Sequence, residues 1–481
     1  IGELMPLPTI LSGNVASALP TGYTVANSCR FNEAVMHKTP GSEGDTQKMT
    51  LSMWVKRSEL GVEQQMWHTQ NGSNQATTLV FGSNDKLYFI ADDSNKLITT
   101  RVFRDPSAFM HICLAIDTTQ GTAGNRAKLY INGVQETVFD TESQPSEDQN
   151  LQWNKTTSHR IGSQADTANN AFNGYLAEVV WIDGTQYAAS DFGEFDEDSP
   201  TIWKPKDVSG LTFGTNGFYL DFEDSSNLGN DANGGTDLTE VSIAAADQAT
   251  DTPTNSFCVL NVLNPSFNGT VTEGNCKQVS TSSAWRGIYG TIPFTTGKWY
   301  AEFKVIAKGS SGGPGVINID DGGDTFRFGE TNRGLGQGEN GVAYLENGQI
   351  LDGGNTIKTG NTSFTDNDIV GVAIDATNGF VYWHKNGTYM EGAKSGQDAG
   401  VPTSGSTGTG GYPLADLVAA NGTYLFGYGG DDAWNIEANF GGCSAFTVSS
   451  ANQDADGYGN FEYAVPSGYY ALCTKNLAEY G

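Results

Sequence analysis

Short apolar runs, separated by polar and glycine-rich breaks, follow one another along the whole chain. The runs are four to ten residues long, and they either alternate apolar with polar residues or are apolar throughout, as is typical of strands in β-sandwiches. Helical spacing of apolar positions over an extended stretch is missing from the sequence. The pattern predicts an all-β protein with strands that include Thr50–Val55, His111–Asp117, Tyr175–Asp183, Trp299–Ile306 and Ile369–Asp375.

The breaks are often marked by Asn-Gly, which occurs eleven times. Asn-Gly suits hairpin turns because both of its residues readily adopt positive φ. An apolar run ending in Asp117 precedes a run ending in Asn132-Gly133, and a run ending in Asp375 precedes one ending in Asn386-Gly387. Two hairpins of one kind predict two sandwiches of one kind. We expect an N-terminal docking arm (1–25), a first sandwich (26–245), a linker (246–265) and a second sandwich (266–481).

Composition and charge narrow the function classes. The chain has 481 residues, of which 61 are glycine, and its 26 basic and 55 acidic side chains give a net charge of −29. This argues against nucleic-acid binding, which depends on Lys and Arg to neutralise phosphates. No apolar run approaches the roughly 20 residues of a membrane helix, so we expect no membrane insertion. The six cysteines are far apart and lack a CxxC spacing, which predicts neither a disulfide framework nor a zinc site.

Several segments resemble known families. The segments LSMWVKR (51–57), HICLAID (111–117), KLYINGV (128–134) and FNGYLAEVVWIDG (172–184) resemble the laminin-G-like, concanavalin-A-like sandwich family. The segments GKWYAEFKV (297–305), DIVGVAIDATNGFVYWHKNG (368–387) and ANFGG (438–442) resemble a SPRY domain. The stretches 214–235, 251–261 and 467–477 resemble large virion proteins of tailed phages, which include tail fibres and lectin-like structural proteins.

The resemblance implies a fold and a setting. The fold is all-β, with two antiparallel jelly-roll-like β-sandwiches in tandem after a short N-terminal arm. The setting is the tail or capsid exterior of a virion, after synthesis in the host cytoplasm. Other virion subunits are then the expected partners, and phage fibres of this kind suggest a homo-oligomer, which we take to be a trimer.

Some proteins with a concanavalin-A-like fold are glycosidases, so the sequence has to be searched for a pair of catalytic carboxylates. A retaining hydrolase needs two carboxylates about 5 Å apart. The string Glu194-Phe195-Asp196-Glu197-Asp198 would place Glu194 and Asp196 on one face of a strand, but no apolar strand continues it. We interpret it as a solvated acidic turn or a weak cation site. Zinc-hydrolase histidine pairs, a GxSxG elbow and a P-loop are all missing from the sequence.

Calcium is the metal that the composition suits best, since it prefers several carboxylate and carbonyl oxygens. The candidate ligands are Asp320, Asp321 and Asp324, with Asp431-Asp432 and Asp454-Ala455-Asp456 as further acidic clusters. None of these matches an EF-hand loop. Laminin-G-like domains often carry a cation at the sandwich rim, so the resemblance leaves a structural Ca²⁺ open. The sequence itself establishes no cofactor, because no motif assigns a cation site.

Sugar binding needs aromatic platforms beside polar side chains on loops. Two groups fit this description. The first combines Trp67 and His68 with Asn71, and the second combines Trp434 with Asp431 and Asp432. The tryptophans Trp54, Trp181, Trp299 and Trp383 fall inside strand patterns and are expected in cores.

The leading hypothesis is a non-enzymatic virion protein, displayed on the particle surface, that binds host-surface glycan or protein. The first alternative is a capsid-decorating or tail-assembly protein whose sandwiches contact other subunits. The second alternative is a glycan depolymerase that uses Glu194 and Asp196.

Overall fold

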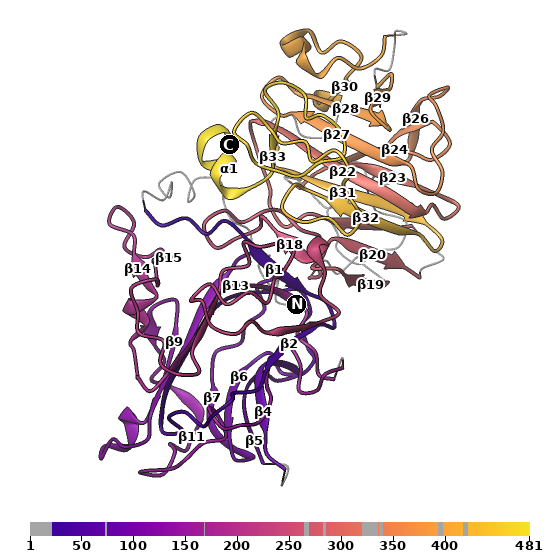
Figure 1. Ribbon diagram of the computed structural model, residues 1–481. Coiled ribbons are helices and arrows are strands. Elements are labelled where there is room, and N and C mark those ends of the chain that lie inside the picture. Colours follow the sequence, from indigo (N-terminus) through magenta and orange to yellow (C-terminus); the bar gives the residue numbers. More distant parts are fainter. Residues whose placement is uncertain are drawn as a thin grey trace, which may run out of the picture. The chain divides into compact units, whose positions relative to one another are not determined.

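A computed structural model describes residues 22–72, 75–167, 169–263, 269–281, 285–319, 335, 340–392, 398–416 and 422–481 (Figure 1). Strands account for 41% of residues and helices for 6%, which confirms the predicted all-β class. The described chain divides into two compact units, residues 22–254 (the first unit) and 255–481 (the second unit). Most of the predicted arm, residues 1–21, lies outside the described residues.

The first unit is built from two antiparallel sheets, each of eight strands. Sheet A contains, in order, β10 (Val134–Gln135), β9 (Ala127–Ile131), β8 (Met110–Asp117), β3 (Lys48–Arg57), β13 (Gly174–Asp183), β1 (Ser28–Phe31) and β18 (Gln248–Ala249), and β16 (Phe218–Leu220) pairs with β13. Sheet B contains β11 (Phe139–Glu142), β7 (Ser94–Thr99), β6 (Leu87–Ala91), β5 (Ala76–Phe81), β4 (Gln64–Gln70), β12 (His159–Ile161), β2 (Val35–Lys38) and β17 (Thr239–Val241). A hairpin of β14 (Gly193–Phe195) and β15 (Trp203–Pro205) stands apart from both sheets.

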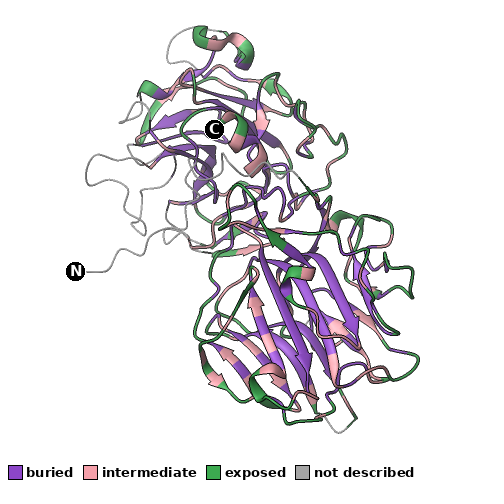
Figure 2. Ribbon diagram, turned by 90° about the vertical axis from the view of Figure 1, so that its left-hand side faces the viewer, coloured by how far each residue is buried: buried purple, intermediate pink, exposed green. Residues whose placement is uncertain are grey.

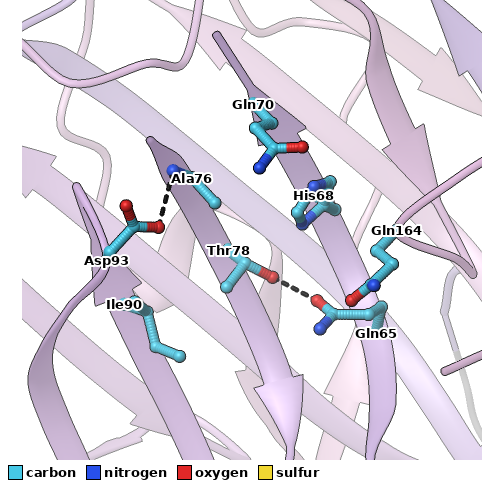
Figure 3. Close-up of a pocket in the computed structure, with 8 residues that line it drawn as sticks. All are labelled: Gln65, His68, Gln70, Ala76, Thr78, Ile90, Asp93 and Gln164. Atoms are coloured by element: carbon cyan, nitrogen blue, oxygen red, sulfur yellow. Dashed lines mark hydrogen bonds between the residues drawn. The ribbon is translucent and has the colours of Figure 1, made fainter. Parts of the chain in front are cut away.

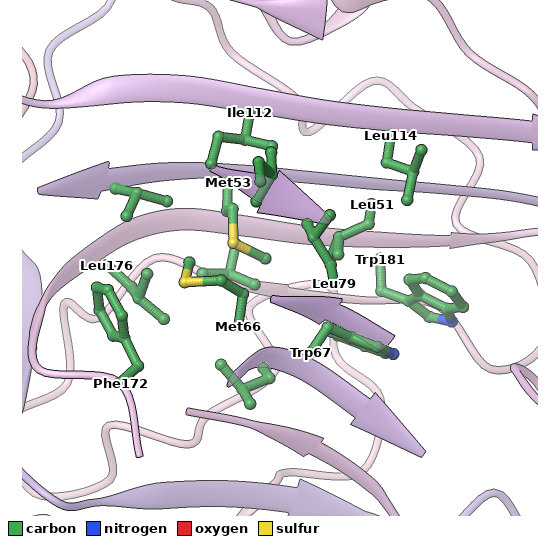
Figure 4. Close-up of a cluster of buried hydrophobic side chains, with 14 of the residues drawn as sticks. Leu51, Met53, Met66, Trp67, Leu79, Ile112, Leu114, Phe172, Leu176 and Trp181 are labelled. Carbon is green, nitrogen blue, oxygen red and sulfur yellow. The ribbon is translucent and has the colours of Figure 1, made fainter. Parts of the chain in front are cut away.

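Alternate residues of the two sheets form the core of the first unit. Met53 on β3, Met66 on β4 and Leu79 on β5 are fully buried in one cluster with Ile112 on β8 (Figure 4). Such interdigitation of inner-face side chains is what holds a sandwich together. Figure 2 shows that buried residues concentrate in the strands, while exposed residues concentrate in the connections.

The chain ends of the first unit meet in sheet A. Strand β1 lies between β13 and β18, so the first strand of the unit pairs with its last. Two ion pairs reinforce this closure: Arg30 contacts Asp247 at 2.9 Å, and the buried Lys56 ammonium contacts the buried Asp251 carboxylate at 2.7 Å.

The second unit also has two sheets. The larger contains β19 (Gly269–Thr272), β20 (Lys277–Ser280), β32 (Asn435–Asn439), β22 (Lys298–Ala307), β27 (Ile369–Asp375), β28 (Phe380–Lys385) and β29 (Thr388–Tyr389), with β30 (Tyr412–Pro413) on β28 and β33 (Tyr470–Ala471) parallel to β22. The smaller contains β21 (Arg286–Tyr289), β31 (Tyr424–Asp431), β23 (Ser311–Asn318), β24 (Gly341–Tyr344), β25 (Ile350–Asp352) and β26 (Asn355–Lys358). The helix α1 (Thr474–Tyr480) follows β33.

A C-terminal strap, residues 443–469, is tied to the larger sheet of the second unit. Glu302 on β22 is buried, and its carboxylate accepts the backbone N–H groups of Glu462 at 2.9 Å and Tyr463 at 2.8 Å. Tyr300 donates to the same carboxylate at 2.9 Å. These bonds satisfy backbone donors of a segment that has few strand partners of its own.

Two predicted Asn-Gly turns are confirmed as equivalent features of the two units. Asn132 and Gly133 both have positive φ (48° and 76°), as do Asn386 and Gly387 (48° and 83°). The Asn132 side chain accepts the His111 N–H at 2.7 Å, and the Asn386 side chain accepts the Ile369 N–H at 2.8 Å. Each turn therefore caps the start of a neighbouring central strand.

Within the part of the chain that the structure describes, no helix is long and apolar enough to cross a membrane.

Candidate functional site

A pocket of about 300 Å³ opens on the side of sheet B that faces away from the core (Figure 3). Its volume is at the lower end of the range for small-molecule sites. Strands β4, β5 and β6, the turn after β6 and the loop after β12 supply its lining residues: Gln65, His68, Gln70, Ala76, Thr78, Ile90, Asp93 and Gln164.

Strand alternation explains why these side chains share a face. On β5, Leu79 enters the core and Thr78 lines the pocket, and on β6 Phe89 enters the core and Ile90 lines the pocket. On β4, Trp67 enters the core, whereas His68 faces the pocket. A β-bulge between Gln65 and Trp67 shifts the register against β5, which sets this division.

His68 is the chemically distinctive residue of the pocket. Only 6% of its surface is exposed, and its Nδ1 atom is buried without a hydrogen-bond partner. Burial, together with the positive charge of Arg160, lowers the pKa of His68 to about 4. The ring is therefore neutral at pH 7, so it offers one donor and one acceptor nitrogen. A buried polar atom without a partner, placed in a pocket, is what a bound ligand would satisfy.

Three other buried histidines have partners for both ring nitrogens. His159 contacts the Thr157 carbonyl and accepts the Asn154 N–H. In His111 the Nδ1 atom accepts the indole N–H of Trp203 at 3.1 Å, and Nε2 contacts the Ser52 hydroxyl at 2.8 Å. His384 accepts the Gly387 N–H at Nδ1 and contacts Tyr300 at Nε2.

The Ser52–His111 pair is not arranged as a nucleophile and its base. Because Nδ1 of His111 accepts a hydrogen bond, the ring proton is on Nε2 and is donated to the Ser52 oxygen. A general base needs the opposite arrangement, with an unprotonated nitrogen facing the hydroxyl. The same argument applies to His384 and Tyr300, so both contacts are structural.

The remaining pocket walls are polar and uncharged apart from Asp93. The Thr78 hydroxyl contacts the Gln65 side-chain oxygen and the Trp67 carbonyl. Gln164 accepts a hydrogen bond from Asn170 at 3.3 Å. Asp93 is exposed, and one of its carboxylate oxygens accepts the Ala76 N–H at 2.9 Å. The pocket thus combines amide, hydroxyl and imidazole groups with small apolar surfaces from Ala76 and Ile90.

The two predicted tryptophan platforms are wrong, because both indoles are buried. Trp67 is 1% exposed and stacks on Trp181 with ring centroids 4.4 Å apart. Trp434 is also 1% exposed and packs against Tyr428 at 4.7 Å. Neither ring presents a face to solvent, so neither can stack on a sugar.

The polar residues predicted beside these tryptophans have separate roles. Asn71 exchanges two hydrogen bonds with Gln75, both 3.0 Å, and so closes the turn from β4 to β5. Asp431 ends β31 and accepts the Asp432 N–H at 3.0 Å, and Asp432 adopts positive φ in the turn that follows. Of the six predicted ligand-binding residues, His68 lines the pocket.

The predicted calcium ligands Asp320, Asp321 and Asp324 lie outside the described residues. A structural Ca²⁺ there stays a prediction. Asp454, in another predicted acidic cluster, uses both carboxylate oxygens to accept N–H groups from Asp456, Tyr458, Ala471 and Asn476. In the described ranges, no three His, Cys, Asp or Glu side chains are grouped so that they could hold a metal ion.

The predicted carboxylate pair at the β14–β15 hairpin is bound to a lysine. Lys204 lies 3.6 Å from Glu194 and 3.4 Å from Asp196. Asp196 also accepts the N–H groups of Asp198 and Ser199, and these bonds hold its pKa below the usual value. The arrangement is that of a capped acidic turn, and neither residue lines the pocket on sheet B.

Comparison with known proteins agrees with this fold. Residues 33–188 match the model of the concanavalin A-like lectin/glucanases superfamily, which confirms the laminin-G/concanavalin-A-like lectin fold. No curated protein matches the sequence.

Three solved structures show the range of structural neighbours. A proposed carbohydrate-binding protein from Bacteroides ovatus is 14% identical with a TM-score of 0.33, and the match covers 46% of this chain and 60% of that protein. The human HERC1 SPRY domain is 12% identical (TM-score 0.24, 36% of this chain, 92% of the domain). A pentraxin from Limulus polyphemus is 13% identical (TM-score 0.28, 40% of this chain, all of the pentraxin). These are likenesses of fold, and we draw no functional conclusion from them.

Proposed function

We propose that the protein is a non-enzymatic recognition protein whose first unit binds glycan in the pocket on β4, β5 and β6. The observation that carries the proposal is His68, which is more than nine-tenths buried and has an unpartnered Nδ1 atom in a polar pocket of a lectin-like fold. Hydroxyl groups of a sugar supply both donors and acceptors, so they suit a neutral imidazole surrounded by glutamine amides. The C–H faces of a sugar suit Ala76 and Ile90.

The test is glycan binding by the full chain, screened on an array and then measured by calorimetry. His68→Ala and Gln164→Ala should each weaken binding about tenfold, since each removes a side chain that would hydrogen-bond to the ligand. His37→Ala on β2 and Gln135→Ala on β10 are matched controls, because neither residue lines the pocket. Binding that survives both pocket substitutions unchanged would refute the site, and an absence of glycan binding would refute the function.

The resemblance of residues 214–235, 251–261 and 467–477 to tailed-phage proteins supports a narrower proposal. In it the protein is displayed on the exterior of a virion, as a tail fibre or similar receptor-binding subunit, and recognises host-surface glycan or protein. Imaging of the particle at a resolution that traces the chain would test this. Pocket openings that face outward would support receptor binding, whereas pockets covered by neighbouring subunits would favour the alternative of a capsid-decorating or tail-assembly protein.

A glycan depolymerase is the remaining alternative, and Lys204 is the observation against it, because it pairs with both candidate carboxylates. Loss of polymer length on incubation with the protein, abolished by Glu194→Gln, would establish that activity instead.

A further inference from the structure

We propose that the pocket on sheet B selects uncharged glycans and rejects acidic ones, and that Asp93 is the residue that sets this specificity. The inference rests on the glycan-binding function proposed above and deepens it. It concerns the class of sugar that the site accepts. We infer that class from the charged groups in and around the pocket.

The charge balance at the pocket is negative. Among the described residues that line it, Asp93 is the one acidic side chain, and burial keeps His68 neutral at pH 7. The Arg160 guanidinium, whose charge acts on His68 from the neighbouring strand, is paired with the Asp166 carboxylate at 2.6 Å, which offsets part of that charge. At the opposite end of the pocket, Gln65 lies 3.4 Å from another carboxylate, that of Glu63. An anionic ligand would therefore meet the Asp93 carboxylate, while the guanidinium of Arg160 beside the pocket is already engaged by Asp166.

The hydrogen-bonding groups point to the same ligand class. Proteins bind carboxylate and sulfate groups mainly through Arg, Lys and clustered N–H donors. Neither Arg nor Lys is among the described residues that line this pocket. Glutamine amides, a threonine hydroxyl and a neutral imidazole instead both donate and accept, which suits hydroxyl groups.

Asp93 is held in place by a tight and conformationally costly turn. Asp92 and Asp93 form the two-residue connection between β6 and β7, and both have positive φ, 50° and 60°. Asn-Gly is the favoured sequence for such a turn, and the chain uses it at Asn132-Gly133 and Asn386-Gly387. Carboxylates in left-handed positions are less favourable than Asn-Gly, and such strain is often found at functional sites.

Contacts on both sides of the turn fix its position. Asp92 accepts the side-chain N–H groups of Gln149 at 2.9 Å and Gln152 at 2.7 Å. Asp93 accepts the Ala76 N–H from the neighbouring strand. The carboxylate at the pocket is thus part of a supported turn, and substitution by asparagine preserves both the turn preference and an acceptor oxygen for Ala76.

The experiment compares one sugar backbone in two charge states. Polygalacturonate fragments and their fully methyl-esterified forms serve as the matched probes, beside a glycan array that contains neutral, sialylated and sulfated members. The wild-type chain should prefer the uncharged member of each pair. Asp93→Asn should improve binding of the acidic member about fivefold at low salt, relative to the uncharged one. Asp198→Asn, an exposed carboxylate on the β14–β15 hairpin, is the matched control and should leave the ratio unchanged.

Salt gives an independent check, because dissolved ions screen charge repulsion at an exposed site. The screening length is roughly 10 Å at 0.1 M salt and becomes shorter as the salt concentration rises. The wild-type preference should therefore shrink as salt rises. A wild-type preference for acidic glycans, or an acidic-to-neutral ratio that Asp93→Asn does not change, would overturn the inference while glycan binding stands. No binding to any glycan would overturn the proposed function itself.

Discussion

Trp67 and His68 are neighbours on β4, yet their side chains have opposite surroundings. The indole of Trp67 lies in the core between the sheets and stacks on Trp181. The imidazole of His68 lies on the other side of the sheet, in the pocket. Trp67 therefore contributes to stability, and His68 is the residue to which the proposed function assigns recognition.

Substitution separates these two roles. Trp67→Ala should lower the free energy of unfolding of the first unit by about 3–5 kcal/mol, because it leaves a large cavity in the core. His68→Ala should change that free energy much less and should weaken glycan binding. Denaturant unfolding and calorimetric binding, measured on both variants, provide the check. Equal losses of stability in the two variants would contradict this assignment.

The sequence indicated aromatic and polar side chains along β4, but it did not show which face of the sheet each of them occupies. The bulge between Gln65 and Trp67 adds Met66 to β4 without a partner on β5. A shift of one residue exchanges the two faces of a strand, so periodicity alone could not place Trp67 in the core. The alternate polar residues Gln65, His68 and Gln70 were the available signal for the pocket. Asp93 and Gln164 come from distant segments, and only the fold brings them to it.

Among the elements, the two hairpins β9–β10 and β28–β29 show what local sequence does determine. Their turns, Asn132-Gly133 and Asn386-Gly387, were predicted from the dipeptide, and positive φ at all four residues confirms them. The side-chain bonds to His111 and Ile369 add a second role that the dipeptide does not reveal. The local turn was predictable, whereas the neighbouring strand that it caps was not.

Alanine at either asparagine should destabilise one unit without affecting the other. Asn132→Ala and Asn386→Ala each combine an unfavourable positive φ with a lost hydrogen bond, which together cost about 2 kcal/mol. Asn132→Gly and Asn386→Gly remove the hydrogen bond but tolerate the turn, so they should cost roughly half as much. Calorimetric melting curves, in which each unit is followed through its own transition, test whether stability decreases from the asparagine parent to the glycine variant and then to the alanine variant. A glycine variant as unstable as the alanine variant would show that φ contributes little.

At the scale of the whole molecule, buried histidines with a lowered pKa are divided unequally between the units, with three in the first unit and one in the second. In the first unit, burial lowers the pKa of His68 to about 4, of His111 to about 3 and of His159 to about 4. Burial raises the pKa of Glu178 in the same unit to about 7, although Tyr219 and Tyr23 donate to its carboxylate. In the second unit, His384 has a pKa of about 3 and Glu302 a pKa of about 7.

These shifts predict that acid destabilises the first unit selectively. A histidine with a lowered pKa takes up its proton more readily when unfolded, so its contribution to stability is lost as pH falls from about 6.5 towards 4. A glutamate with a raised pKa acts in the opposite direction, and its unit gains stability as pH falls from about 7 to 4.5. Each group changes the free energy of unfolding by about 2 kcal/mol between pH 7 and pH 5.

With three such histidines against one glutamate, the first unit should lose about 4 kcal/mol of unfolding free energy over this range. In the second unit the opposing shifts of His384 and Glu302 nearly cancel. Scanning calorimetry at pH 7 and pH 5 should show one transition move down and the other stay. Parallel movement of both transitions would contradict the unequal division. A variant with His111→Gln should reduce the pH dependence of the moving transition if it folds, and the pH titration of histidine ring protons by NMR measures the same shifts without mutation.

The pairing of β1 with β18 also constrains when the first unit can fold during synthesis. Ser28 on β1 bonds to the carbonyl of Asp251, 223 positions later in the chain. Sheet A therefore cannot be completed until the ribosome has released residues 248–251. Until then the edge of β1 that later pairs with β18 stays unpaired and can hydrogen-bond to other strands. During translation the unpaired strand can therefore pair with a strand of a neighbouring nascent chain. Chaperones that bind nascent chains and shield such strands would raise the yield of folded protein.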